Sequence, residues 1–127
     1  MGVQVSAGHF TAVTALVDTG AQISAFPREL TTRLSLKTAP TGDTVPLVLV
    51  NGQEVICPIL ETNMMFDTRD AGTAILDGCE IAILPTGSQV ILGLDILAQF
   101  EYRIADGILY LLKEKARPQM EIAGGGD

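Results

Sequence analysis

The sequence lacks tryptophan, has one histidine (His9) and contains only two cysteines in 127 residues. One histidine cannot build a histidine-rich metal site, and no serine or cysteine pattern around it indicates a catalytic triad. Two cysteines do not make a disulfide framework. Because Cys57 and Cys79 lie in apolar stretches, we expect two buried free thiols, although the sequence leaves a single bridge open. No metal or other cofactor is predicted.

Membrane-spanning and secretory segments are also missing. No apolar run approaches the ~18 residues of a membrane span, and no charged-then-apolar signal peptide opens the chain. A net charge of −7 argues against nucleic acid or an anionic membrane as a partner. We therefore expect a soluble protein, with the cytoplasm favoured.

What the chain has in abundance is small apolar residues and turn formers. Hydrophobic residues make up 47% of the chain and aromatic residues 5%, so valine, isoleucine, leucine and alanine must fill the core. The 13 glycines and 6 prolines are spread along the sequence, which favours many short strands over long helices. The length indicates one domain.

The most informative stretch is residues 15–22, in which three apolar residues precede Asp18, Thr19 and Gly20. An apolar run predicts a buried strand, and Gly20 allows a sharp turn that a residue with a Cβ would resist. Asp18 should therefore lie at the end of a core strand, with its carboxylate beside apolar residues. The motif alone is short, since a strand that ends in these residue types is more often a plain turn.

The flanking residues narrow the interpretation. Residues 15–26 resemble the active-site signature of aspartic proteases. Residues 90–97 resemble the partner element of that family, which consists of apolar residues, a glycine and a short helix. The separation of 75 positions between Asp18 and Gly93 suits the small single-lobed branch, the retropepsins. The resemblance covers roughly residues 3–112.

In motif style the chain looks closer to the cellular branch of retropepsins than to the viral enzymes. Residues 20–22 and 92–95 carry this likeness, and that branch includes the retroviral-protease-like domain of DNA-damage-inducible proteins. Many viral members have an aspartate where this chain has Gln22 and an arginine where it has Leu94, so both members of an ion pair are replaced together. We interpret Asp95 as a structural residue at the start of the short helix, where an anion is stabilised.

The resemblance implies a retropepsin-like acid protease fold over residues 1–112. This fold is all-β, a closed barrel-like sandwich of short strands and hairpins with one short C-terminal helix. Residues 113–127 are linker-like in composition and are predicted to be a disordered tail.

Local patterns predict several turns and helices within this fold. Three dipeptides are typical of hairpin turns, Asn51-Gly52, Asp77-Gly78 and Asp106-Gly107. Residues 27–34 and 95–100 are predicted to be helical, and residues 36–43 to form a loop. In retropepsins the hairpin at the place of Asn51-Gly52 is the flap, which closes over an extended peptide.

The resemblance also implies a site. Asp18 is the catalytic carboxylate, Thr19 braces the two active-site loops across a dimer, and Gly20 lets the substrate backbone approach. The implied substrate-binding residues are Ala21, Gln22, Val50, Asn51, Gly52, Leu92 and Gly93.

One carboxylate per chain implies two chains. Peptide hydrolysis without a metal needs one group to activate water and another to protonate the products, and two carboxylates that share a proton supply both. The chain has one Asp-Thr-Gly, so the second carboxylate must come from a second copy in a two-fold homodimer. The predicted activity is that of an aspartic endopeptidase acting on extended peptides, inhibited by pepstatin-type compounds and favoured by acidic pH.

Two other functions stay open at this point. The chain could be a peptide-binding module of the same fold with weak or absent turnover, or a dimerisation domain built on its terminal strands. The intact Asp-Thr-Gly favours the protease, because a scaffold has no need of Asp18. A phosphatase with a catalytic aspartate would need an Asp-x-Asp pattern, which the sequence does not have.

Overall fold

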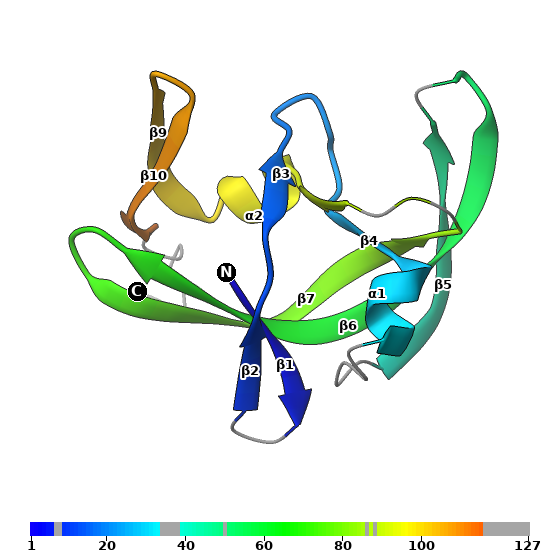
Figure 1. Ribbon diagram of the computed structural model, residues 1–127, viewed down its shortest axis with the longest axis horizontal. Coiled ribbons are helices and arrows are strands. Elements are labelled where there is room, and N and C mark those ends of the chain that lie inside the picture. Colours follow the sequence, from blue (N-terminus) through cyan, green and yellow to red (C-terminus); the bar gives the residue numbers. More distant parts are fainter. Residues whose placement is uncertain (7–8, 34–38, 50, 86, 88, 116–127) are drawn as a thin grey trace, which may run out of the picture.

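The computed structural model describes residues 1–6, 9–33, 39–49, 51–85, 87 and 89–115 (Figure 1). Within these ranges the chain is mostly β with two short helices, which confirms the predicted all-β class. The strands are β1 Gly2–Ser6, β2 His9–Ala12, β3 Ala15–Val17, β4 Ala25–Pro27, β5 Ala39–Val48, β6 Glu54–Thr68, β7 Gly72–Leu84, β8 Val90–Leu92, β9 Phe100–Ala105 and β10 Ile108–Glu114. The helices are α1 Arg28–Arg33 and α2 Leu94–Leu97.

Eight of these strands form one strongly curled sheet, a half-barrel in which the long strands β6 and β7 bend around the core (Figure 1). The strand order is β2-β1-β6-β7-β4-β8-β3, with β5 paired to β6. At the centre, β4 runs parallel to β7 and antiparallel to β8, and β8 runs parallel to β3. The parallel pairing of β3 and β8 places the carboxyl ends of these two strands side by side, although they are far apart in the sequence.

β9 and β10 form a separate two-stranded hairpin. The turn after β6 holds this hairpin through its backbone. The Arg69 and Asp70 N–H groups donate to the carbonyls of Leu111 and Leu112, at 2.8 and 3.0 Å. The C-terminal hairpin is thus attached to the tip of the β6–β7 pair.

The two faces of the sheet bury two separate apolar clusters. The larger cluster contains Phe66 and Phe100, whose rings meet edge to face with centroids 5.3 Å apart. The smaller cluster lies where the β5–β6 hairpin meets the sheet, and its fully buried residues are Ala25, Cys57 and Ala82. β8 shows the alternation, since Val90 and Leu92 join the larger cluster and Ile91 the smaller one.

The predicted hairpin turn at Asp77-Gly78 is wrong, because β7 passes through both residues without turning back. Gly78 has a φ of +66°, and its N–H donates to Asn63 Oδ1 on β6 at 2.9 Å. The pairing register of β6 and β7 shifts beside Asn63. The dipeptide therefore forms a β-bulge, where a side-chain amide replaces a ladder partner. The hairpin turns earlier, at residues 69–71.

The other local predictions fare differently. Asp106-Gly107 forms the predicted two-residue hairpin, with φ values of +53° and +75° as in a type I′ turn. The loop predicted at residues 36–43 is wrong from Ala39 onward, because β5 starts there. β5 is an edge strand, which tolerates its two prolines. Both short helices exist as predicted but are shorter: α1 starts at Arg28 because Pro27 ends β4, and α2 ends at Leu97, with Phe100 already in β9. Residues 34–38 lie outside the described residues.

The C-terminal boundary is described only in part. β10 continues to Glu114, two residues beyond the predicted domain end at 112. Residues 116–127 lie outside the described residues. The division into a domain and a disordered tail therefore stays a prediction.

Cys57 and Cys79 are free and buried, which confirms the expectation from their apolar surroundings. Cys57 belongs to the smaller cluster and Cys79 to the larger one. Burial raises the pKa of both thiols. At Cys79 the carboxylates of Asp95 and Asp77 add to the effect of burial, and the pKa rises to about 11.

We expect both thiols of the folded protein to resist alkylation by iodoacetamide at about pH 8, because the thiolate is the reactive form and both pKa values are raised. Mass spectrometry after timed quenching measures the labelling, and the urea-unfolded protein is the control. Labelling of native Cys79 should accelerate as the pH rises toward its pKa of about 11. Equal rates for folded and unfolded protein would contradict the buried placement.

Candidate active site

Asp18 begins the turn that leaves β3, at the point where β3 and β8 end together. Its N–H donates to the Leu92 carbonyl at 3.0 Å, and its own carbonyl accepts the Ala21 N–H at 3.1 Å. Its Oδ1 accepts the Gly20 N–H at 3.0 Å. The carboxylate is half-buried and is held by the turn that follows it, which confirms the predicted position at a strand end. The prediction of a buried core strand is wrong, because β3 lies at the edge of the sheet and its residues are partly exposed.

Gly93 allows the two strand ends to approach closely. A Cβ at this position would lie 2.9 Å from the Ala21 carbonyl oxygen and 3.0 Å from that of Ile23. The Leu94 N–H donates to the same Ala21 oxygen at 2.9 Å. Backbone atoms held in hydrogen bonds cannot move aside easily, so glycine is the residue that fits here.

A buried serine and the aspartate of α2 close the other end of the turn. Ser24 is 0% exposed, and its N–H and Oγ donate to Asp95 Oδ1 at 3.0 and 2.7 Å. Ser24 Oγ also accepts the Gly93 N–H at 2.8 Å, and Asp95 Oδ1 accepts the Ile96 N–H at 2.9 Å. These bonds confirm the structural interpretation of Asp95. Ser24 was not predicted, and its only sequence signal is a hydroxyl inside an apolar run.

Four of the predicted substrate-binding residues lie in or beside the Asp18 turn, namely Ala21, Gln22, Leu92 and Gly93. Leu92 and Gly93 are buried, whereas Gln22 is exposed. Gln22 lines a hollow of about 440 Å³ whose walls also carry the acidic side chains of Asp77 and Glu80. The turn therefore brings these four residues together, with the Gln22 side chain at its surface.

Of the remaining predicted substrate-binding residues, Asn51 and Gly52 lie in the turn between β5 and β6. The Gly52 N–H donates to the Leu49 carbonyl at 2.8 Å, and Asn51 Oδ1 accepts the Gln53 N–H at 2.9 Å. These bonds stay within the hairpin, and its tip stands apart from the end of β3 in Figure 1. Val50 lies outside the described residues. The predicted hairpin is confirmed, while its role as a flap stays a prediction.

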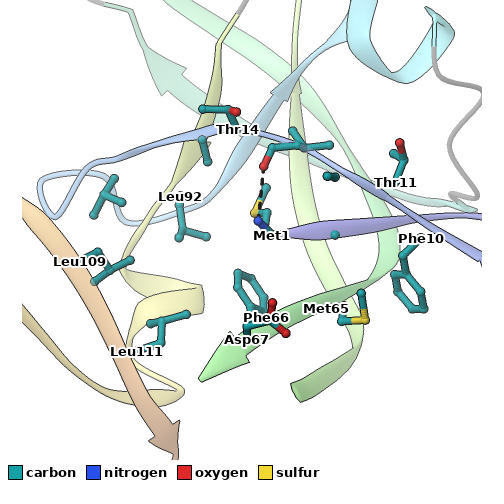
Figure 2. Close-up of a pocket in the computed structure, with 15 residues that line it drawn as sticks. Met1, Phe10, Thr11, Thr14, Met65, Phe66, Asp67, Leu92, Leu109 and Leu111 are labelled. Carbon is teal, nitrogen blue, oxygen red and sulfur yellow. Dashed lines mark hydrogen bonds between the residues drawn. The ribbon is translucent and has the colours of Figure 1, made fainter. Parts of the chain in front are cut away.

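Apolar side chains border the Asp18 turn on both faces of the sheet. On one face, register partners run from Leu16 through Ile91 to Ala25, and Leu16 is 45% exposed. On the other face, a groove of about 560 Å³ opens between the start of the chain, β3 and β10. Figure 2 shows Leu109 and Leu111 on one side of this groove, opposite Met65 and Phe10 on the other.

The chemical groups of the turn are few. It offers one carboxylate, the exposed Thr19 hydroxyl and the exposed backbone of Gly20. Among the residues that the structure describes, no group of three or more histidine, cysteine, aspartate or glutamate side chains could hold a metal ion. No helix in the same part of the chain is long and apolar enough to cross a bilayer.

Gly93→Ala should lower the free energy of unfolding by about 1–3 kcal/mol, because the added methyl group meets backbone atoms that must shift. Urea unfolding measures the change, and an unchanged m-value shows that the unfolding transition is otherwise the same. Gly42→Ala is the control for steric contact. Its added Cβ would meet no atom within 4 Å, so any loss of stability there comes from the φ of +87° alone. A Gly93 variant as stable as the wild type would contradict the close approach.

Comparison with known proteins identifies one family. Residues 3–99 match the sequence model of a family described as "gag-polyprotein putative aspartyl protease". No curated protein and no solved structure gave a match. The matched segment is most of the chain and includes both the Asp18 turn and the Gly93 contact. The curled half-barrel with two short helices is consistent with a retropepsin-like fold. The chain therefore belongs to the gag-polyprotein aspartyl protease family.

Proposed function

We propose that this chain is an aspartic endopeptidase that works as a two-fold homodimer, with Asp18 of each copy forming the catalytic dyad. The observation that supports this most is the Asp18 turn itself. Its backbone is fixed by hydrogen bonds to Leu92 and Leu94, while Thr19 and Gly20 remain exposed. Membership of an aspartyl protease family supports peptide hydrolysis by this carboxylate.

The proposed chemistry follows from two carboxylates placed close together. At about 3 Å they cannot easily ionise at once, so they share one proton and titrate as a pair. The ionised carboxylate takes a proton from the water that attacks the peptide carbonyl carbon. The protonated carboxylate supplies a proton to the carbonyl oxygen. When the intermediate collapses, the first carboxylate gives the proton it took from water to the leaving nitrogen, and the second takes a proton back from a hydroxyl of the intermediate, so the dyad again holds one proton. Thr19 would brace the two turns across the axis.

Exposed apolar side chains beside the turn and on the C-terminal hairpin support association of two copies. Leu16 is 45% exposed beside the strand end, and Ile104 and Ile108 of the C-terminal hairpin are 47% and 53% exposed. The groove in Figure 2 is lined by apolar side chains of β3 and β10 and opens next to Asp18's strand. A second copy that covers these surfaces would bury apolar area and bring its own carboxylate.

The proposed substrate is an extended peptide held between the Asp18 turn and the β5–β6 hairpin. Backbone pairing with the hairpin near Asn51 and Gly52 would hold the peptide as an added strand. Leu16 and Ile91, which share one sheet face beside the turn, favour apolar substrate side chains. The narrower likeness of residues 20–22 to the cellular branch stays a prediction.

Asp18→Asn should abolish peptide cleavage, because an amide can neither take a proton from water nor share one with its partner. Turnover of a peptide library, read by mass spectrometry, measures the loss, and pepstatin-type compounds should inhibit the wild type. Asp106→Asn is the matched control, since asparagine tolerates the φ of +53° found at that position. Cleavage that survives Asp18→Asn would overturn the proposal. Peptide binding without any wild-type cleavage would support a binding module instead.

Mixing wild type with Asp18→Asn tests the shared site. If each dimer needs one carboxylate from each copy, an equal mixture that exchanges subunits fully should keep about one quarter of the activity of the same total amount of wild type. A site complete within one chain would keep about half. Sedimentation of the same samples gives the fraction of dimer.

Cleavage should follow a bell-shaped pH profile with its maximum on the acidic side of neutrality, because the active dyad holds one proton. Activity should fall at higher pH as that proton is lost, and at lower pH as the second carboxylate is protonated. Initial rates measured under dimeric conditions at each pH test this. A rate that keeps rising into the alkaline range would contradict a carboxyl acid.

A further inference from the structure

The Asp95 carboxylate forms hydrogen bonds with N–H and O–H donors. Its Oδ1 accepts three hydrogen bonds, from Ser24 N–H at 3.0 Å, Ser24 Oγ at 2.7 Å and Ile96 N–H at 2.9 Å. Within the described ranges, no lysine or arginine forms an ion pair with it. The carboxylate therefore serves here as a hydrogen-bond acceptor and not as one half of an ion pair.

Ser24 links Asp95 to Gly93, the residue that follows the end of β8. Its hydroxyl has one proton, which goes to Asp95, and a lone pair of the same oxygen accepts the Gly93 N–H at 2.8 Å. The Ser24 carbonyl accepts the Ala82 N–H on β7 at 3.1 Å. Because Ser24 and Gly93 are both buried, loss of the hydroxyl would leave the Gly93 N–H without this acceptor and without water.

The same segment contacts the Asp18 turn at three points. The Leu92 carbonyl accepts the Asp18 N–H, and the Leu94 N–H donates to the Ala21 carbonyl. Ser24 and its bond to Asp95 make the third point, at the far end of the turn. Removal of that point loosens the far end of the turn, which then keeps the Ala82 N–H bond to the Ser24 carbonyl and the pairing of β4 but loses its link to the Gly93 segment, so the position of the Asp18 carboxylate becomes less defined.

We propose that Asp95 is a positioning residue, which acts through Ser24 to fix the turn that carries Asp18. It does so as a hydrogen-bond acceptor, and its negative charge is dispensable. The effect on turnover rests on the proposed protease function. The effect on the backbone does not, because it concerns only the N–H groups of Gly93 and of the turn.

Four variants test this. Asp95→Ala removes all three bonds, Ser24→Ala removes the hydroxyl bridge, and Asp95→Asn keeps an oxygen that can accept the same donors. Asn63→Ala is the matched control, because it removes two side-chain hydrogen bonds on β6, to Gly78 N–H and Gln4, outside the Asp18 turn. For each variant, kcat and KM are measured on fully dimeric protein, and amide exchange at Gly20 and Gly93 is followed by NMR.

Asp95→Ala and Ser24→Ala should lower kcat by roughly 10- to 100-fold with little change in KM, since a small displacement of a reacting group has effects of this size. The same variants should speed amide exchange at Gly20 and Gly93 relative to Asn63→Ala. Asp95→Asn should restore kcat to within about tenfold of wild type, because a neutral acceptor weakens these bonds without removing them.

Two outcomes would overturn the proposal. If Asp95→Asn loses as much kcat and exchange protection as Asp95→Ala, the charge is required. If Asn63→Ala lowers kcat as much as Ser24→Ala at equal loss of stability, the effect is general destabilisation. Should Asp95→Ala fail to fold, Ser24→Ala and Asp95→Asn still decide the question. Should the wild type lack peptidase activity, the exchange data decide it alone, and the Asp18→Asn result reports separately on the proposed function.

Discussion

The structure depends on one place where two backbone segments meet with no side chain between them. Gly93 approaches the carbonyls of Ala21 and Ile23 so closely that a methyl group would not fit. This contact requires β3 and β8 to end together, and the parallel pairing of those strands satisfies that requirement. The location of the Asp18 carboxylate is set by this meeting of strand ends. The hydrogen bond from the Gly20 N–H to Asp18 Oδ1 then orients the side chain within the turn.

Much of this site could be predicted because its determinants are local in sequence. The apolar run before Asp18 predicts a strand, Gly20 predicts a turn, and a short apolar run before Gly93 predicts the partner strand. Each of these features needs only neighbouring residues. The hairpin at Asp106-Gly107 is local in the same sense, because both residues accept the positive φ that its turn requires.

The features that could not be predicted depend on partners far away in the chain. Asp77-Gly78 is compatible with a turn or with a bulge, and the choice is made by Asn63 on the neighbouring strand. Ser24 is separated from Asp95 by 71 positions, so nothing near it in the sequence reveals its role. The start of β5 contains Pro40, a residue that in a sequence is typical of a loop. It forms a strand here because β5 pairs with β6 alone, and an edge strand tolerates proline.

The attachment of the C-terminal hairpin has a mechanical consequence. The N–H groups of Arg69 and Asp70 hold β10 by two backbone hydrogen bonds. At the base of the hairpin, the Lys115 N–H after β10 donates to the Gln99 carbonyl before β9 at 2.8 Å. Tension applied to the chain beyond Lys115 would load these bonds and the β9–β10 ladder first. Along the chain, tension from the C-terminal side reaches the strand ends around Asp18 only after β10, β9 and α2, so it would detach the hairpin before it displaced the carboxylate.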